Sequence, residues 1–317
     1  GRYDDGVSKR TGYPTIGDPE DTELNRAQIS YESDVVDVTV GRQRIQLGNM
    51  RFVGNEDWRQ NEQTFDAARV DLNLVEDLTL TYVYLEQVNR TFGDNAANGR
   101  YQSDSHLGEV TYAFTPNFSA KAYSYLISLD EAPTVSTANY GLRLMADFPL
   151  GDAVTLSTAA EYAHQTDYDN NTTDQSLDYY RAEANLAVDS WTLMLGAEVL
   201  GSDGQRGFSF PIASNHGHNG WADVFASKTP AEGLVDLWVG ATVDFGKVGP
   251  FKSIAATAIY HDFSSDRGSI DFGQEVDLGL KAKLPGGFGV GLVGETYGGA
   301  DTLTDTNKVS LYLTYAL

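Results

Sequence analysis

The sequence contains no cysteine, little positive charge and no long apolar run. Without cysteine, disulfide bonds, thiolate chemistry and cysteine-based zinc or iron–sulfur sites are excluded. No stretch approaches the roughly 20 apolar residues that a transmembrane helix needs. Methionine is scarce, with 3 residues, and the long Leu/Ala/Glu/Lys runs typical of helical domains are missing.

The charge balance narrows the class of partner. The chain has 22 basic and 45 acidic residues, for a net charge of −23. Nucleic-acid binders carry a basic face, so a nucleic-acid partner is not expected. A polybasic helix lying on a membrane surface is excluded for the same reason. Strong acidity suits a surface that faces aqueous medium or divalent cations.

Period-2 alternation of apolar and polar residues is the dominant pattern. Glycine, tyrosine and phenylalanine are abundant, with 32, 18 and 14 residues. In 235–245, valine, leucine, alanine and phenylalanine occupy one face, and Asp236, Trp238 and Asp244 lie on the other. Alternation at 180° per residue is the signature of a β-strand. The same split occurs in 140–148, 154–164, 179–188, 191–200, 276–284 and 309–317.

About fifteen such segments follow one another, each near the ~9–11 residues of a tilted membrane-spanning strand. Their connections alternate between short and long, as in a bacterial barrel with short turns on the periplasmic side and long loops outside. The short connections are 33–34, 76–77, 116–117, 151–152, 189–190, 246–250 and 285–287. The long ones are 49–62, 93–105, 131–138, 166–177, 201–233, 264–273 and 299–306.

These patterns predict an all-β fold, an antiparallel transmembrane β-barrel that forms a single domain over residues 1–317. A soluble β-sandwich also alternates, but its strands are shorter and its connections lack this parity. The chain opens with a polar stretch and no signal peptide, and we interpret 1–22 as an external loop. The first recognisable strand, near 24–31, then runs down from a long loop. Barrels normally have an even number of strands, so we expect N-terminal strands to be missing from this sequence.

One stretch carries a family resemblance. Residues 40–70, VGRQRIQLGNMRFVGNEDWRQNEQTFDAARV, resemble the alginate-export family of outer-membrane barrels, as do 11–31 and 78–93. The resemblance covers about the first third of the chain. It implies an eighteen-stranded barrel, with three strands missing here. Family members range from an exporter of the acidic polysaccharide alginate, whose pore is lined with arginines, to many porin-like proteins. This chain departs from the exporter in its strong acidity.

A channel needs a constriction and a charge pattern rather than a catalytic group. Arg42 and Arg44 share a strand face, which Gln46 continues, and a lipid-facing arginine would cost roughly 2–4 kcal/mol. We therefore expect both arginines in the lumen, with a β-bulge near Gly41 that switches the phase after Val40. The alternative is a position at the barrel rim, near lipid headgroups.

The following loop, 49–60, mixes aromatic, basic and amide residues. Phe52 and Trp58 would be of little use in a solvated loop. We predict that the loop folds inward and narrows the pore, with Arg51 and Arg59 pointing to solute. A loop packed on the outer rim, with no gating role, is the alternative.

Alternation places further charges in the lumen. Arg69 cannot share a face with Asp66, so any pairing of these residues must be across strands. Arg143 shares a face with Asp147, and Arg181 with Glu183. The rest of the predicted lumen set is Glu161, Glu198, Asp236, Asp244, Glu275, Asp277, Lys281, Lys283 and Glu295. Such a mixed lining favours polar, zwitterionic or sugar-like solutes, and any one pair can equally serve to lock the barrel.

Two weaker patterns lie in long loops. His216 and His218 form a His-x-His pair without an obvious third ligand, so a solvated or lumen-plugging loop is the default. Phe208, Phe210 and Trp221 indicate that this loop packs, in the barrel mouth. The run 167–174 has oxygen ligands suited to calcium but lacks the EF-hand glycine and glutamate. No metal and no cofactor are expected.

The sequence therefore predicts a passive channel in the outer membrane of a Gram-negative bacterium. Its expected partners are membrane lipid, lipopolysaccharide, the barrel-assembly machinery and small hydrophilic solutes, including acidic or neutral saccharides. No nucleophile elbow, P-loop or zincin motif is present, so an enzyme is not expected. A barrel enzyme remains the alternative, although His106, His164 and His261 have no convincing partner in sequence. A plugged structural or adhesive barrel is a third possibility.

Overall fold

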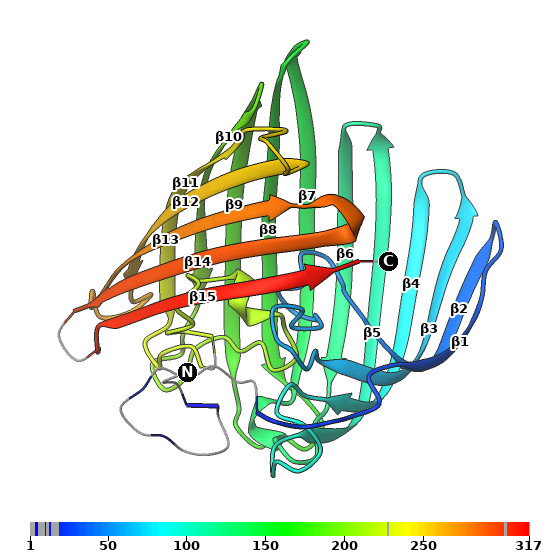
Figure 1. Ribbon diagram of the computed structural model, residues 1–317. Helices are drawn as coiled ribbons and strands as arrows, with labels where there is room; N and C mark the ends of the chain where they lie inside the picture. Colours follow the sequence, from blue (N-terminus) through cyan, green and yellow to red (C-terminus); the bar gives the residue numbers. More distant parts are fainter. Residues whose placement is uncertain are drawn as a thin grey trace. The chain divides into compact units, whose positions relative to one another are not determined.

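The computed structural model describes residues 4–5, 10, 13, 19–226, 228–300 and 303–316. Almost all regular structure is β-strand, in one antiparallel sheet whose order follows the sequence from β1 to β15 (Figure 1). The strands are β1 (Ala27–Tyr31), β2 (Val36–Gln43), β3 (Thr64–Val75), β4 (Leu78–Asn89), β5 (Arg100–Thr115), β6 (Phe118–Ile127), β7 (Thr137–Gly151), β8 (Val154–Asp167), β9 (Ser176–Val188), β10 (Trp191–Leu200), β11 (Leu234–Asp244), β12 (Ser253–Ser264), β13 (Asp271–Lys283), β14 (Phe288–Gly299) and β15 (Thr306–Tyr315).

Helix is confined to three short 3-10 turns among the described residues, η1 (Pro133–Val135), η2 (Asn215–Gly217) and η3 (Pro285–Gly287). In the part of the chain that the structure describes, no helix is long and apolar enough to cross a membrane. The predicted all-β class is confirmed.

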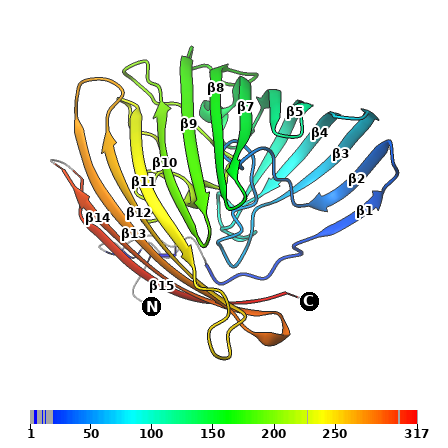
Figure 2. The ribbon, with the colours of Figure 1, turned by 90° about the horizontal axis from the view of Figure 1, so that it is seen from above.

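The connections alternate in length as predicted. Strands β3 and β4 are joined by two residues, and β5 and β6 likewise, whereas 44–63 and 201–233 form long connections between β2 and β3 and between β10 and β11. Figure 2 shows neighbouring strands β2 to β5 following one another in sequence order. Asp77 and Asp189 lie in two of the short turns with positive φ, a conformation that aspartate tolerates better than most residues.

The chain divides into two compact units. Unit 1 comprises Gly1–Leu144, Tyr162–Tyr179 and Phe208–His218, and unit 2 comprises Met145–Glu161, Tyr180–Gly207 and Asn219–Leu317. Strands β7, β8 and β9 contribute to both. The expected single domain and the eighteen-strand count stay predictions.

In unit 2 the two faces of each strand have opposite chemistry. On β11 and β13, the side chains of Val239 and Leu278 are each 56% exposed. On the opposite face of the same strands, Asp236, Glu275 and Asp277 are buried. We call the face with buried side chains the inner face and the face with exposed apolar side chains the outer face. This polarity is the reverse of a water-soluble sheet, where the apolar face is the buried one.

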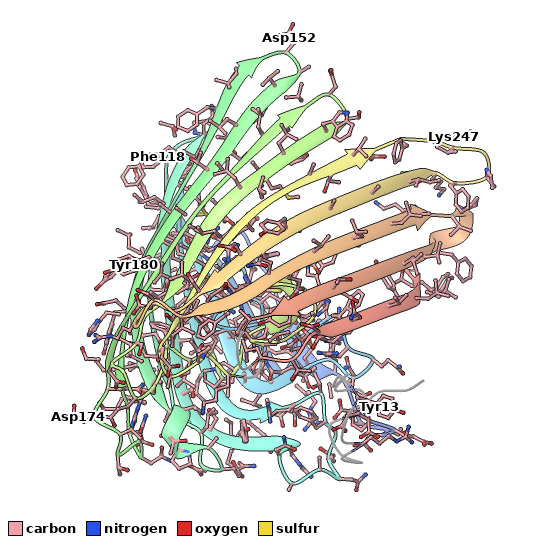
Figure 3. All side chains as sticks on the ribbon, turned by 90° about the vertical axis from the view of Figure 1, so that its left-hand side faces the viewer. Tyr13, Phe118, Asp152, Asp174, Tyr180 and Lys247 are labelled. Carbon is pink, nitrogen blue, oxygen red and sulfur yellow. The ribbon has the colours of Figure 1, made fainter. Side chains whose placement is uncertain are left out.

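Unit 1 also exposes apolar side chains on its outer face, but its inner face buries aromatic and aliphatic side chains beside charged ones such as Glu109 and Arg143. On β4, Tyr82 is exposed and Val83 is fully buried, and on β6 Tyr123 and Tyr125 are buried. Figure 3 places Phe118, which precedes the inner-face tyrosines on β6, beside a short turn, and Asp174 in the connection at the opposite ends of the strands. The outer apolar rows need a non-aqueous neighbour, since each exposed Leu or Phe forgoes about 1.5–3 kcal/mol of burial energy in water.

Candidate functional site

The candidate site is the inner face together with two chain segments that pack on it. The first insert consists of residues 44–63 and 208–218, both in unit 1. Its two parts are joined by a parallel bridge between Val53 and Ile212. The amide of Gly54 donates to the Ile212 carbonyl over 3.0 Å, and the amide of Ser214 donates to the Met50 carbonyl over 3.0 Å. The two distant segments therefore form one piece.

Phe52 anchors the first insert to the wall. Its ring centroid lies 5.2 Å from that of Tyr123 and 5.7 Å from that of Tyr125, both on the inner face of β6. It is edge-on to Tyr179 of β9 at 5.6 Å. Phe210, from the second part of the insert, completes the cluster at 5.0 Å from Phe52. Such aromatic contacts add about 0.5–1.5 kcal/mol each beyond the area they bury.

A polar network completes the first insert. Arg44 donates to Glu62, which also accepts from the Asn55 amide over 2.8 Å. Gln46 in turn donates to the Asn55 oxygen over 2.7 Å. The hydrogen bond to Glu62 raises the pKa of the Arg44 guanidinium, so Arg44 stays charged. Since Glu62 is buried, this network satisfies a carboxylate that would otherwise be costly to desolvate.

The second insert consists of residues 219–225 in unit 2, and carboxylates hold it on the inner face. The Trp221 amide donates to Asp277 over 3.1 Å, and the Ala222 amide donates to Glu275 over 2.6 Å. The Asn219 side chain donates to Glu198 over 2.6 Å. Backbone amides that leave water need acceptors, and charged acceptors make the stronger bonds.

The carboxylates of unit 2 are balanced by few cations. His261 lies between two acids, with Nδ1 2.8 Å from Asp236 and Nε2 3.7 Å from Asp277. Arg181 pairs with Glu183 at 2.9 Å and with Glu198 at 3.2 Å. Its guanidinium also lies 4.8 Å from the Trp238 ring centroid. The described part of unit 2 therefore presents a wall with an excess of negative charge.

No group of three or more possible metal ligands occurs among the described residues. His216 of the His-x-His pair stacks on Trp58 with the ring centroids 4.4 Å apart, and His218 is buried. In the run 167–174, Asp167 accepts from the Gln175 amide and Asp169 from the Ser128 hydroxyl. The His-x-His pair and the run 167–174 therefore take part in contacts that hold their loops.

Known proteins share both a sequence pattern and the fold with this chain. Residues 15–95 match the model of the family described as Alginate export. Three solved structures share the fold. OccAB4 of Acinetobacter baumannii has a TM-score of 0.69 and 16% identity, with 91% of this chain and 73% of that chain covered. OpdQ of Pseudomonas aeruginosa has a TM-score of 0.71 and 17% identity, with 90% and 80% covered.

The third structure is that of the outer membrane protein OpdK of Pseudomonas aeruginosa, with a TM-score of 0.72 and 15% identity over 91% of this chain and 78% of that one. The chain has the fold of outer-membrane β-barrel proteins. The predicted resemblance to the alginate-export family is confirmed, and the match accounts for strands β1 to β4. No curated protein matches the chain.

The barrel places the predicted arginines of the first strands in different surroundings. Arg42 pairs with Asp66 of β3 at 2.7 Å, a contact across strands. Asp66 lies between Phe65 and Ala67, which are both buried on the inner face, so the pair belongs to the outer face. Arg42 thus lies at the rim, the alternative to the lumen.

The expected bulge at Gly41 is wrong. The pairing of β2 runs through Gly41 without a register shift on both sides, to β1 and to β3. Gly41 instead adopts a φ of +115°, and a Cβ there would lie 2.4 Å from the Ala27 carbonyl oxygen. Glycine therefore absorbs a local twist without adding a residue. Val40 is 53% exposed, and Arg42 keeps its phase.

The loop 49–60 folds inward, as Phe52 shows, but its arginines differ from the expectation. Arg51 is only 2% exposed, and its guanidinium stacks 3.9 Å from the Phe210 ring centroid. It therefore does not point to solute. Arg59 is half-buried, next to Trp58 in the chain. Whether this loop narrows a pore stays a prediction.

The other predicted residues lie on the strands. Arg69 pairs with Asp71 at 2.7 Å, and Arg143 is buried on β7. Arg181 and Glu183 share the inner face, as predicted. Lys281 and Lys283 are exposed at the end of β13 that leads into a short connection.

Sequence reasoning missed the partners of the histidines. Asp236 and Asp277, which hold His261, come from β11 and β13 on either side of β12. His164 of β8 contacts Asp178 of β9. The available signal was the period-2 alternation on either side of the connection 168–175. It puts residues 162 and 164 of β8 and residues 176 and 178 of β9 on the same face of the sheet.

Proposed function

We propose that this barrel is a passive channel that lets hydrophilic solutes cross the outer membrane. The supporting observation is that exposed apolar side chains cover the outer face of both units, while charged side chains line the inner face of unit 2. An inner wall of this kind is useful only where it encloses water or polar solute.

The wall chemistry supports a preference among solutes. In unit 2, Glu198, Asp236, Glu275, Asp277 and Glu295 are buried on the inner face. The negative field of these carboxylates attracts cations and disfavours anions. We therefore propose neutral and zwitterionic solutes, including neutral saccharides, ahead of acidic ones. The arginines of unit 1, Arg69 and Arg143, are the groups that would favour an acidic saccharide. Lipid contact follows from the outer face, and we propose lipopolysaccharide and the assembly machinery as further partners.

Planar-bilayer conductance tests the proposal. Purified, folded protein should give step conductance in salts with ions of unequal size, with cations favoured over anions. Neutral oligosaccharides should then reduce the current more than oligouronates do, with vanillate, which accompanies OpdK in one solved structure, as a small carboxylate for comparison. Stronger block by oligouronates would favour export of acidic polysaccharide. Heat-unfolded protein serves as the control.

A plugged barrel is the second candidate, and one observation favours it. Both inserts pack on the inner face, where Phe52 and the Trp221 amide have wall partners. Folded protein that gives no conductance, but gains it when residues 219–225 are replaced by a short glycine linker, would support this candidate and contradict an open channel.

A further inference from the structure

A cluster of four polar side chains lies on strands β8 and β9 of unit 1. Nδ1 of His164 lies 2.9 Å from Oδ1 of Asp178. Nε2 of the same imidazole lies 3.5 Å from Oγ of Ser176. The Tyr162 hydroxyl donates to Oδ1 of Asp178 over 2.8 Å. A carboxylate on one ring nitrogen and a hydroxyl on the other is the order found in serine hydrolases.

The cluster belongs to the outer face. The neighbours that alternate with it, Ala163, Gln165, Leu177 and Tyr179, are all buried on the inner face. Tyr162, His164, Ser176 and Asp178 are half-buried or exposed. Tyr180, the next outer-face position on β9, projects from the outer side of the sheet in Figure 3. The cluster adjoins the long connection 168–175, which lies on the external side in barrels of this layout.

A second histidine on the outer face shows the simpler arrangement. Nδ1 of His106 on β5 lies 2.7 Å from the Tyr82 hydroxyl, and its Nε2 is 3.8 Å from Asp104. There a tyrosine occupies the ring nitrogen that Asp178 occupies on His164, and the carboxylate is only distantly placed. The hydrogen bond with Tyr82 therefore accounts for the presence of His106 on the outer face. It does not explain why His164 joins a carboxylate to a serine hydroxyl.

We propose that Ser176, His164 and Asp178 form a hydrolytic site on the outer face that cleaves carboxylic esters of membrane amphiphiles. Ser176 Oγ attacks the ester carbonyl carbon while His164 takes the hydroxyl proton. The tetrahedral intermediate collapses, the C–O bond to the alcohol breaks, and His164 returns the proton to the leaving oxygen. Water then attacks the acyl-serine with the same proton transfers, releasing the carboxylic acid. Asp178 positions the imidazole, and Tyr162 positions Asp178.

The place of the cluster selects the substrate class. Tyr140 and Tyr162 are both exposed on this face, in the manner of the aromatic girdle that marks the boundary between lipid tails and headgroups. Ester carbonyls of membrane lipids lie at that boundary. A water-soluble ester would have to leave water to reach the site, whereas a lipid of the outer leaflet is already there. The activity goes beyond the proposed channel and uses the opposite face of the wall.

Labelling with a fluorophosphonate probe tests the site. The full-length chain, folded in detergent micelles, is treated with the probe, and the labelled residue is located by mass spectrometry. We expect label on Ser176 and none on S176A. S124A is the matched control, because Ser124 is on the outer face of β6, contacts no histidine among the described residues, and should leave labelling unchanged.

Release of fatty acid from phospholipid micelles gives the second readout. S176A and H164N should each lower the rate by on the order of 10⁶-fold, the loss expected when the nucleophile or the base of a triad is removed. D178N should lower it less, and D178E should restore part of the loss, which a purely structural role of Asp178 would not produce. Folding of each variant is checked by its unfolding temperature, which should equal that of the unaltered protein.

Two results would overturn the proposal. The first is folded barrel that leaves Ser176 unlabelled. The second is hydrolysis that persists at the same rate in S176A and H164N. Because H164N retains the serine, it keeps the test decisive if S176A fails to fold. Loss of conductance in the unaltered protein would count against the channel and not against this site.

Discussion

The two inserts are attached to the same kind of wall by different forces. The first insert packs Phe52 among Tyr123, Tyr125 and Tyr179, with aromatic contact as the main attachment. The second insert donates its backbone amides to Asp277 and Glu275. Apolar packing depends on shape and tolerates changes in charge, whereas amide–carboxylate bonds depend on keeping each acceptor. The two regions should therefore respond to different substitutions.

The largest effect is expected for Phe52→Ala. Removing a fully packed aromatic side chain costs about 3–5 kcal/mol, because the cavity collapses only in part. The unfolding temperature of the barrel should fall, and the first insert should become accessible to protease. Phe118→Ala, at an exposed position next to a short turn, is the control. An unfolding temperature equal to that of the F118A variant would show that the cluster does not hold the insert.

The double variant Glu275→Ala, Asp277→Ala should detach the second insert and leave the first in place. Each amide loses a charge-assisted bond, for which about 1.5–3 kcal/mol is typical. Hydrogen exchange of the Trp221 and Ala222 amides should accelerate by at least about 10-fold. A loss of about 1.4 kcal/mol raises the population of the open, exchanging state by a factor of ten. Asp244→Ala, which removes an exposed acid near a short connection, serves as the control. Unchanged exchange at both amides would contradict the attachment.

Gly220→Ala tests the second insert from its own side. Gly220 has a φ of +81°, and a Cβ there would lie 2.5 Å from the Glu275 carboxyl carbon. The strain should cost about 1–3 kcal/mol and accelerate exchange at Trp221 and Ala222. Gly217→Ala is the matched control within the same connection, because a Cβ at Gly217 meets nothing within 4 Å. Equal exchange rates in the two variants would argue that the close approach is not maintained.

The smallest effect is expected for Arg42→Ala. The Arg42–Asp66 pair lies on the outer face, and its loss should cost no more than about 1 kcal/mol. The reversal potential of the R42A channel in a potassium chloride gradient should equal that of the unaltered protein. Arg181→Ala, by contrast, leaves Glu183 and Glu198 without their cation and should raise the preference for cations. A change in selectivity with R42A as large as that with R181A would place Arg42 on the inner face.

Alternation sufficed to predict the strands and, except for Arg42, the side on which the compared strand residues lie. Asp236 and Val239 are on opposite faces of β11, and Arg181 and Glu183 share one, because side-chain direction in a strand is a local property with period two. The short and long connections were also predictable, since turn residues interrupt the pattern. Gly41 was misjudged because a glycine can change its backbone angle without changing the register.

Contacts between distant segments could not be predicted in this way. Arg51 has its ring partner in Phe210, which comes from a different long connection. No periodicity links such positions. Composition indicated only that the loops carry aromatic residues and must pack somewhere, which held for Phe52, Phe208 and Phe210.

The connection between β10 and β11 also sets an order of assembly. Its first part, with Phe210, packs on Phe52 of the connection 44–63 and on Tyr179 of β9, which both precede it in the chain. Its next part, with Trp221, needs Asp277 of β13, which is synthesised later. Contacts between distant positions form slowly, because the intervening chain must first be closed into a loop. The carboxylate-bound part therefore stays undocked until β13 has joined the sheet, which makes its attachment a marker of late maturation.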